Sequence, residues 1–452
     1  MTVRLQDIRD CFEGVIPSVV ATASRDGTPN VSYLSHVHYV DDSHVALSNQ
    51  FFSKTASNVR ENPRVSVLVV SARTGAQYVL DAVFTRTEER GELFERMDAH
   101  LKASRHPAGI GAVMALRSAD IYRVIECRAV PTPVEHGAAP PAGGSDRLGP
   151  AARLCQRLAH LRSADPGELI DAVLDGLSDT FGIQHMMILA HDVDAGRLVT
   201  LASRGYPRSG IGSEVAFGEG VIGIAAERRR PVRIADMSRE QRMAAAAHGH
   251  VGTDENTTRT VALPGLSDAQ SQIAVPLVAQ DELLGVLFAE ARQRLAFSHE
   301  DEDALTVIAA QLSALLGLVE ASQAEERGPV TNASAELLRE QHPDTFEVTY
   351  FHADDSIFVD RNYIIKGLPG RLLWRFLTSY TNEGRQDFTN RELRLDTSLR
   401  LPDLKDNLET RLLLLMRRLD EKSAPIRLSR PARGRIRLDV RGAPVLRETE
   451  NS

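Results

Sequence analysis

The chain has 452 residues, of which 42% are hydrophobic and 25% are charged, and its formal net charge is −8. These proportions are those of an ordinary soluble globular protein. The length predicts about three domains, because a single hydrophobic core rarely grows beyond ~250–300 residues.

Cysteines and apolar segments exclude several classes of protein. The three cysteines, Cys11, Cys127 and Cys155, are widely spaced and lack metal-site spacing, which is typical of a reducing cytoplasm. The N-terminal segment has mixed charge rather than the apolar core of a signal peptide. The longest apolar segment, residues 304–319, is interrupted by polar residues and is too short to span a bilayer. We therefore expect a cytoplasmic protein without a membrane segment.

Charge is distributed unevenly along the chain. Residues 361–441 hold 19 Lys and Arg against 10 Asp and Glu, a local charge of +9, so the remainder carries −17. A basic end on an acidic protein favours nucleic acid as a partner.

Residues 1–135 are predicted to form a small barrel. Segments of β-forming residues are separated by turn signals such as Asp26-Gly27, which is typical of a hairpin. We predict strands at residues 17–23, 30–40, 45–48, 64–70, 76–86 and 120–127, and helices at 5–13, 53–61 and 88–104. Short strands at this spacing favour a barrel over a parallel sheet.

The segment 47–70 carries the strongest functional signal. A strand ends at Ser48 and Asn49, and a helix begins at Ser53 and Lys54. Free N–H groups, a hydroxyl and an ammonium can converge on a phosphate at such a junction. These positions, together with the sequence ENPRVS at residues 61–66, resemble the flavin-binding split barrels of the pyridoxamine 5′-phosphate oxidase family.

In that family the lysine and its neighbours hold the phosphate of FMN. The resemblance therefore implies an FMN site formed by Ser32, Ser48, Asn49, Gln50, Ser53 and Lys54. The alternative is a capped helix between two core strands, with Lys54 in solvent.

The chain departs from the family pattern beside this site. Enzymes of the family carry further basic residues on the preceding strand, where this chain has Ser32 and Val37. The difference disfavours pyridoxamine-phosphate oxidation and favours a flavin that acts as a redox element or ligand, with FAD, a deazaflavin or haem as alternatives.

We interpret His36 and His38, which alternate along the strand, as hydrogen-bonded barrel histidines rather than metal ligands. No catalytic residue or metal site is predicted.

Residues 136–150 form a Gly-, Pro- and Ala-rich linker, and a second unit spans 151–325. Gly218, Gly220 and Gly223 satisfy the G-x-G-x-x-G pattern of dinucleotide-binding folds. The flanking segments read as antiparallel hairpins, whereas a dinucleotide fold needs parallel β-α-β crossovers. The order of elements resembles a GAF domain, in which such glycines let a helix pack closely on the sheet.

The GAF resemblance implies either a small-molecule ligand, covered by residues 238–271, or pairing through terminal helices. His248 and His250 could chelate a metal there, but two histidines without further ligands argue against it. The helix at 300–319 offers an apolar face beyond what its own sheet needs, so we expect a homodimer.

A second linker, 326–345, precedes a third unit at 346–445 and a tail at 446–452. Strands, three helices and a basic hairpin predict a winged helix, and their order resembles the effector domain of response-regulator transcription factors. Its third helix has leucines at helical spacing, namely Leu404, Leu408, Leu412, Leu415 and Leu419. The resemblance implies DNA contacts from the third helix (Lys405, Asn407 and Arg411) and from the wing (Arg430, Arg433 and Arg435).

The same helix also carries Asp403, Asp406 and Glu409, which would lie near DNA phosphates and weaken binding. The alternative of a winged helix that binds protein instead of DNA therefore remains.

We predict a multidomain α+β protein with a split β-barrel, a GAF-type (PAS-like) antiparallel α/β sandwich and a winged helix-turn-helix. Its function is either a flavin-containing regulator that binds DNA or a flavin-dependent oxidoreductase whose other two domains regulate it and assemble partners.

Overall fold

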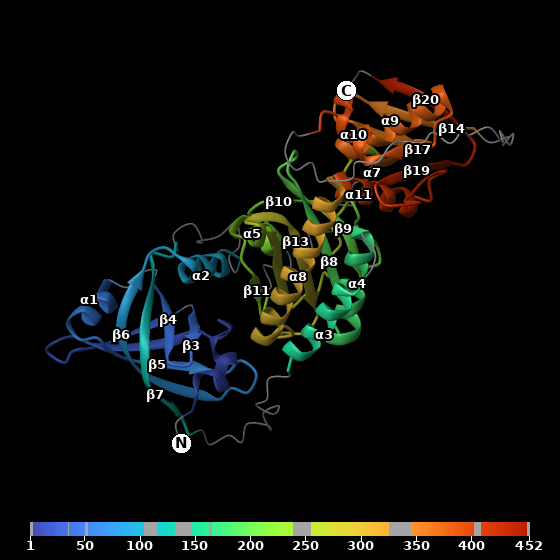
Figure 1. The fold of residues 1–452 in the computed structure, drawn as a ribbon. Helices are drawn as coiled ribbons and strands as arrows, with labels where there is room; N and C mark the ends of the chain where they lie inside the picture. Colours follow the sequence, from blue (N-terminus) through green and yellow to red (C-terminus); the bar gives the residue numbers. More distant parts are fainter. Residues whose placement is uncertain are drawn as a thin grey trace.

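The computed structural model describes residues 3–34, 36–49, 53–103, 115–131, 146–161, 165–237, 255–324, 345–401 and 408–449. Three units follow one another along an elongated molecule, and the two termini lie at opposite ends (Figure 1).

The first unit is a seven-stranded antiparallel sheet that encloses its own core. In sheet order its strands are β2 (Pro29–Leu34), β1 (Ser18–Ala23), β5 (Arg64–Val70), β6 (Gln77–Glu88), β7 (Ser118–Ala129), β4 (His44–Asn49) and β3 (Val37–Asp41). Alternate residues such as Val20, Val67 and Leu80 point inward and are fully buried, as the two-residue period of a strand requires. The helical elements are η1 (Leu5–Phe12), a 3₁₀-helix, α1 (Ser53–Glu61) and α2 (Glu92–Ala103).

The predicted strand at 30–40 is two strands. β2 ends at Leu34 and β3 begins at Val37, and these two strands occupy opposite ends of the sheet order. The chain changes partner between them: β2 pairs with β1, whereas β3 pairs with β4, so the ladder is interrupted between Leu34 and Val37 and the two edges of the sheet are brought together there.

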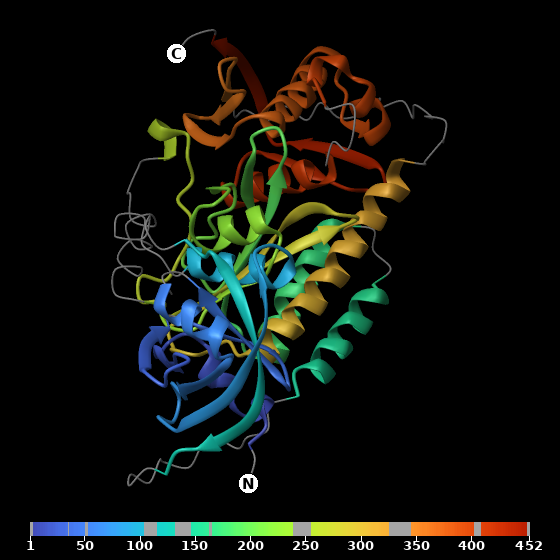
Figure 2. The ribbon, with the colours of Figure 1, turned by 90° about the vertical axis from the view of Figure 1, so that its left-hand side faces the viewer.

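The second unit is a six-stranded sheet covered on both faces. Its strand order is β10 (Glu214–Ala216), β9 (Arg197–Arg204), β8 (His185–Asp192), β13 (Glu282–Ala291), β12 (Ser271–Ala279) and β11 (Val232–Ile234), and every pair is antiparallel. Helices α3 (Leu148–Ala159), α4 (Pro166–Phe181) and α8 (His299–Ala324) cover one face. Figure 2 shows α8, in gold, beside α3 and α4, in green.

Helix α5 (Gly220–Arg228) covers the other face of this sheet, joined by α2 of the first unit. A Cβ at Gly223 would lie 2.2 Å from the backbone oxygen of Ala216 in β10, so this glycine permits the close approach of helix and strand. Antiparallel pairing throughout excludes a dinucleotide-binding fold for the described part of this unit.

Helix α8 contains the one segment of the described chain, His299–Val319, that is long and apolar enough to span a membrane by length and composition. In this structure the helix packs against β12, α3 and α4.

The third unit has a four-stranded sheet, three α-helices and a small three-stranded sheet among its described residues. The larger sheet has the order β16 (Asn362–Ile365), β15 (Ser356–Val359), β14 (Thr345–Phe351) and β20 (Ala443–Thr449). The helical elements are α9 (Leu368–Glu383), α10 (Asn390–Leu395), η3 (Thr397–Leu399) and α11 (Leu408–Glu421). The smaller sheet has the order β17 (Asp387–Thr389), β19 (Arg435–Val440) and β18 (Ile426–Ser429).

Two features of the third unit differ from the predicted boundaries. β20 pairs in parallel with β14 as far as Thr449, so the predicted tail at 446–452 contributes to the sheet. Residues 402–407, which include the predicted N-terminal turn of the third helix, lie outside the described residues. The leucines that repeat along α11, from Leu408 to Leu419, are buried as the helical period predicts.

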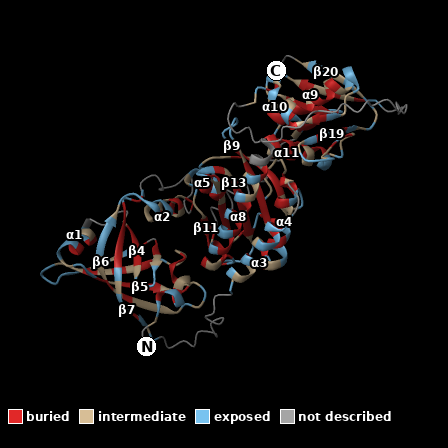
Figure 3. Cartoon of the chain, viewed as in Figure 1, coloured by how far each residue is buried: buried red, intermediate tan, exposed pale blue. Residues whose placement is uncertain are grey.

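The second and third units share one continuous hydrophobic cluster. Leu413 of α11 packs on Gly167 at the start of α4, where an added Cβ would lie 3.0 Å from the leucine side chain. A short helix of the second unit, α7 (Glu255–Thr258), contacts β16. Buried residues run through the sheets of all three units (Figure 3).

Candidate functional site

The predicted phosphate site lies where β4 ends and α1 begins. β4 ends at Asn49 and α1 begins at Ser53, as the strand–turn–helix interpretation requires. Lys54, in the first turn of α1, is exposed. Gln50 and the side chain of Ser53 lie outside the described part of the chain.

Ser48 and Asn49 contact protein groups. The Ser48 hydroxyl is buried and donates to the His36 carbonyl oxygen at 3.2 Å. The Asn49 amide donates to an Asp120 carboxylate oxygen at 3.3 Å. Ser48 therefore braces β4 against the segment before β3, and Asn49 joins β4 to β7.

Ser32 faces the first turn of α1 across a polar cluster. The Ser32 hydroxyl lies 3.0 Å from the Thr55 hydroxyl, and the Asn30 amide donates to the same oxygen at 3.0 Å. Asn30 and Ser32 share one face of β2 because they are two residues apart. Sequence reasoning missed Asn30 and Thr55, although this alternation was a signal for the first of them.

These groups have the donor chemistry that a phosphate needs. An exposed ammonium, two hydroxyls and an amide lie around the N-terminal turn of a nine-residue helix. The N-terminus of a helix also favours an anion through its unpaired N–H groups. The residues present therefore fit the phosphate end of an FMN-type cofactor.

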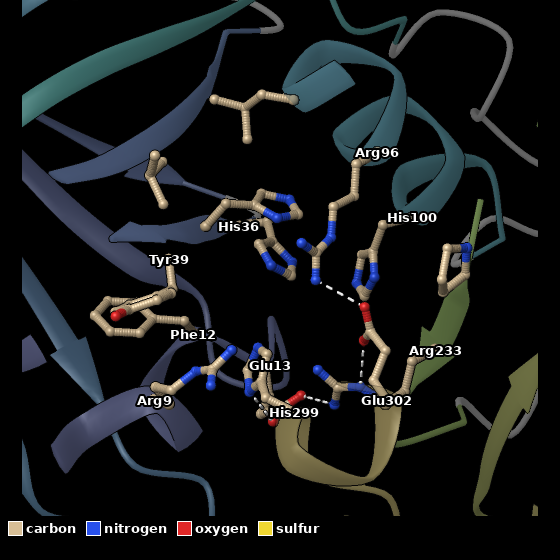
Figure 4. Close-up of a pocket in the computed structure, with 14 residues that line it drawn as sticks. Arg9, Phe12, Glu13, His36, Tyr39, Arg96, His100, Arg233, His299 and Glu302 are labelled. Atoms are coloured by element: carbon tan, nitrogen blue, oxygen red, sulfur yellow. Dashed lines mark hydrogen bonds and ion pairs between the residues drawn. The ribbon is translucent and has the colours of Figure 1, made fainter. Parts of the chain in front are cut away.

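A second site lies between the first and second units. It is a cavity of about 120 Å³. Its lining includes three arginines, four histidines and two glutamates: Arg9, Arg96, Arg233, His36, His38, His100, His299, Glu13 and Glu302. These residues come from η1 and the residue after it, from β3 and the residue before it, from α2, from β11 and from the start of α8. The side chains labelled in Figure 4 converge on the cavity.

Arg233 is the centre of a buried ion network in this cavity. Its Nη1 pairs with Glu13, and its Nε donates to Glu302 at 2.9 Å. Arg96 approaches the other oxygen of Glu302 at 2.7 Å, and His299 lies 3.1 Å from Glu13. The side chains of Arg233, Glu13 and Glu302 are only 6%, 4% and 9% exposed, so these pairs are shielded from water.

The network keeps both glutamates ionised. Burial by itself raises the pKa of Glu13, but Arg233 and His299 outweigh it and lower that pKa to about 2. Burial likewise opposes ionisation of Glu302, yet Arg233 and Arg96 lower its pKa to about 2. The pKa of Arg233 is raised, because the two carboxylates outweigh the cost of its burial.

Three histidines form a stack beside this network. The rings of His36 and His38 are stacked with centroids 3.8 Å apart, and His100 meets His36 edge-on at 4.4 Å. Gly14 makes room for this stack, because its Cβ would lie 2.2 Å from Nδ1 of His36. Burial is the main cause that lowers the pKa of all three, to about 4 for His100 and well below the usual value for His36 and His38. The rings are therefore neutral at pH 7.

The expectation that His36 and His38 are hydrogen-bonded barrel histidines is wrong for one atom. Nε2 of His38 is buried and has no hydrogen-bond partner, because the ring faces the cavity rather than another strand. Within the ranges that the structure describes, no group of three or more His, Cys, Asp or Glu side chains is arranged to hold a metal ion.

Sequence reasoning missed the ion network. Glu13, Arg96, Arg233 and Glu302 come from four separate segments of the chain, so no local spacing connects them. One signal was present: Arg233 is a charged residue inside the short apolar strand Val232–Ile234, and charged side chains are rarely buried without a partner.

The predicted DNA-reading helix α11 lies against the second unit. Arg411, only 6% exposed, pairs with Asp194 at 2.7 Å and Asp192 at 3.4 Å, at the β8–β9 turn. Arg430, also predicted to contact DNA, pairs with Asp165 at 3.0 Å and with Glu409 at 2.6 Å. These two arginines face carboxylates in this structure, and the prediction that Arg411 faces a groove and Arg430 a phosphate stays a prediction.

The remaining predicted DNA contacts have different positions. Arg433 and Arg435 are exposed in and beside the turn between β18 and β19. Lys405 and Asn407 lie outside the described residues.

Two further arginines fix α11 to the second unit. Arg417 pairs with Asp171 at 3.0 Å and donates to the Leu201 carbonyl oxygen at 3.2 Å. Arg418, 1% exposed, lies 3.4 Å from Glu255 and donates to a carbonyl oxygen of its own unit. The basic surface of the third unit thus meets acidic residues of the second.

Two family models match the chain. Residues 5–127 match the model described as pyridoxamine 5′-phosphate oxidase, and residues 163–316 match that of the GAF domain. The chain contains a pyridoxamine 5′-phosphate oxidase-like domain and a GAF domain. We call them the barrel domain and the GAF domain below, and the third unit the C-terminal unit.

Individual proteins resemble parts of the chain. An uncharacterised protein of Methanocaldococcus jannaschii is 29% identical over 108 residues, which is 23% of this chain and 70% of that protein. The GAF domain of an Acinetobacter phosphoenolpyruvate-protein phosphotransferase is 24% identical, covers 39% of this chain and 95% of its own, and has a TM-score of 0.31. An FMN-binding protein from Syntrophomonas wolfei is 15% identical, covers 28% and 86%, and has a TM-score of 0.25. At these TM-scores the two structures assign no function to this chain.

Proposed function

We propose that this protein is a flavin-containing regulator in which the GAF domain controls the C-terminal unit. The observation that carries the proposal is the contact between α11 and the GAF domain, where Arg411, Arg417 and Arg418 pair with GAF carboxylates. A sensory domain that holds the working surface of its neighbour can release that surface when a ligand shifts the balance between two states.

An FMN-type cofactor is the proposed occupant of the barrel domain. Support comes from the family match and from the donors around α1, with Lys54 and Ser53 as the proposed phosphate contacts. A flavin would supply redox or light-absorbing chemistry, while the chain supplies the phosphate contacts and the surrounding barrel.

The cofactor proposal is tested with the spectrum of the purified protein and with one matched pair of variants. Lys54→Ala should weaken flavin binding about 10- to 150-fold, the equivalent of ~1.5–3 kcal/mol for a charge-assisted contact. Arg60→Ala, at the other end of the same helix, is the control and should leave binding unchanged. Equal affinity in both variants would contradict the assignment of Lys54, and a haem band would replace flavin with haem.

A winged helix is the proposed identity of the C-terminal unit. Support comes from the order of its elements, in which three helices are followed by a basic β18–β19 hairpin. We propose DNA as its partner, with Arg433 and Arg435 as exposed wing contacts to phosphates. Because α11 lies on the GAF domain, DNA binding in this state is held back and requires release of the helix.

Release is tested by removing the acidic partners rather than the arginines. The double variant Asp192→Asn/Asp194→Asn leaves α11 unchanged but removes both partners of Arg411. It should bind genomic DNA fragments and heparin at least tenfold more tightly than the wild type at equal salt. Asp268→Asn, whose partner Arg292 is an exposed residue of the GAF domain itself, is the control.

The second candidate function is a flavin-dependent oxidoreductase whose C-terminal unit binds protein. One observation favours it: α11 already uses its arginines on a protein surface. If neither the wild type nor the double variant retains any DNA fragment or heparin, this candidate replaces the first.

A homodimer remains part of the proposal. Val307 and Leu318 on α8 are 46% and 65% exposed, so apolar surface is left after the helix has packed in its own domain. Sedimentation at micromolar concentration should therefore give twice the mass of the chain, and a monomer there would contradict the proposal.

A further inference from the structure

We propose that the cavity between the barrel domain and the GAF domain binds a small anion, either an organic carboxylate or an inorganic oxyanion. Bound there, the anion would connect the two domains, because η1, β3 and α2 line one side of the cavity and β11 and α8 line the other (Figure 4). The inference depends on neither flavin nor DNA binding.

The charge of the lining favours an anion. Three arginines face two glutamates, and the three stacked histidines are neutral because burial lowers their pKa values. Arg233 and Arg96 are occupied by Glu13 and Glu302 at short distances. The third arginine, Arg9, has only long ion pairs, to Glu300 and Asp303, and neither of these carboxylates lines the cavity.

The side chain of Arg9 is fixed in position, but its hydrogen-bonding groups are not all paired. Its nearest carboxylates, on Glu300 and Asp303, lie 3.8 and 3.7 Å from Nη1 and are 36% and 54% exposed. Its guanidinium stacks over the ring of Tyr39 at 4.8 Å, which fixes its plane. Its Nε is buried and has no hydrogen-bond partner. A buried N–H of this kind costs free energy unless an acceptor reaches it.

His38 supplies the second unpaired group. The residue is 9% exposed, and its Nε2 is buried without a partner while its ring is fixed by the stack with His36. In the tautomer with the proton on Nε2, this nitrogen donates to an acceptor in the cavity. An anion that accepts from Arg9 and His38 would satisfy both unpaired atoms, which a purely apolar ligand could not do.

The size of the cavity limits the ligand. About 120 Å³ corresponds to several water molecules, or to a ligand of roughly three to eight non-hydrogen atoms. Formate, acetate, nitrate and phosphate are within this range, whereas benzoate and a flavin are too large. The flavin site and the anion site are therefore separate.

The experiment uses the full chain and isothermal titration with sodium formate, acetate, nitrate, phosphate and benzoate, at constant ionic strength set with chloride. We expect saturable binding of one equivalent of at least one small anion and none of benzoate. Carboxylates and inorganic oxyanions are separate arms, so the titration also decides which source supplies the ligand. Arg9→Met and His38→Phe should each weaken binding tenfold or more, while Arg294→Met, on the surface of the GAF domain, should not change it.

Hydrogen exchange of the wild type keeps the proposal testable if a variant does not fold. The bound anion should slow exchange both in β3 and in β11, which lie on opposite sides of the cavity. A separate titration with Zn²⁺ in chloride completes the set. Three results would each overturn the proposal: no saturable binding of a small anion, anion binding unaffected by both variants, or saturation by Zn²⁺ alone that is lost in His38→Phe. The last of these would make the histidine stack a metal site.

Discussion

Replacing Arg233 by methionine should weaken the contact between the barrel and GAF domains more than any surface charge does. Arg233 is shared by Glu13 and Glu302, and all three side chains are at most 9% exposed. Methionine fills much of the same volume, so the loss is chiefly electrostatic. Removing one partner of a buried pair costs ~3–5 kcal/mol, because a charge is left without compensation. Glu302 retains Arg96, so the lower half of this range applies.

Hydrogen exchange measured by mass spectrometry is the appropriate assay, because a chain with several domains need not unfold in one step. A loss of ~3–4 kcal/mol in local stability raises exchange rates in η1 and β11 by more than about a hundredfold. The control is Arg294→Met. Arg294 is 59% exposed and pairs with Asp236, so its loss should cost less than ~1 kcal/mol.

The pH dependence of the difference in exchange rate between Arg233→Met and the wild type shows whether the difference is electrostatic. In the wild type the pKa values of Glu13 and Glu302 are about 2, below the usual 4.5, so the stability they contribute is present above pH 4.5 and is lost as pH falls toward 2. Without Arg233, burial raises both pKa values, and the carboxyls of the variant take up protons at higher pH. The difference in local stability between Arg233→Met and the wild type should therefore become smaller from pH 7 to pH 4. Equal exchange in Arg233→Met and Arg294→Met, or a gap independent of pH, would refute the reasoning.

Three further predictions concern the GAF domain and the cavity. Gly223→Ala places a Cβ 2.2 Å from a backbone oxygen of β10 and should cost ~1–3 kcal/mol of stability, measured by denaturant unfolding; a variant as stable as the wild type would contradict the close packing of α5. In α8, a Cβ added at Gly317 would lie 4.0 Å from its nearest neighbour, so Gly317→Ala should instead stabilise the folded protein by up to ~1 kcal/mol. A loss of stability in this variant would indicate that the helix is more crowded than described. Acid should loosen the barrel–GAF contact, because the pKa of His100 is about 4 in the folded protein against 6.5 normally. Above pH 6.5 the His100 ring is neutral in both the folded and the unfolded state, so its contribution to the free energy of unfolding is fully present. As pH falls to 4, the unfolded state takes up a proton first and up to ~3 kcal/mol of the free energy of unfolding is lost. Identical melting curves at pH 7 and pH 5 would contradict this.

The local structure could be predicted from spacing alone. The strand–turn–helix around Asn49 and Ser53, the buried leucines of α11 and the antiparallel hairpins of the GAF domain follow from periods of 2 and 3.6 residues and from turn residues. The stack of Trp374 on Tyr350 does not follow from spacing, since the two rings come from separate elements.

The candidate flavin site was predictable in part. Lys54 and Ser32 come from segments near one another in the sequence, and the strand and helix that carry them have recognisable patterns. Thr55 and Asn30 were missed because a hydroxyl and an amide have no distinctive spacing until β2 is placed against α1.

The amino-acid sequence by itself determined the order of the domains, the period of each helix and strand, and the excess of positive charge at residues 361–441. Only the tertiary structure decided where those charges go. Arg411 and Arg417 meet Asp194 and Asp171 of the GAF domain, more than 200 positions earlier in the chain. The cavity around Arg233 likewise depends on residues from separate elements. The physical reason is that a backbone hydrogen-bond pattern depends on neighbours in sequence, whereas ion pairs and cavities depend on which surfaces the folded domains bring within a few ångströms.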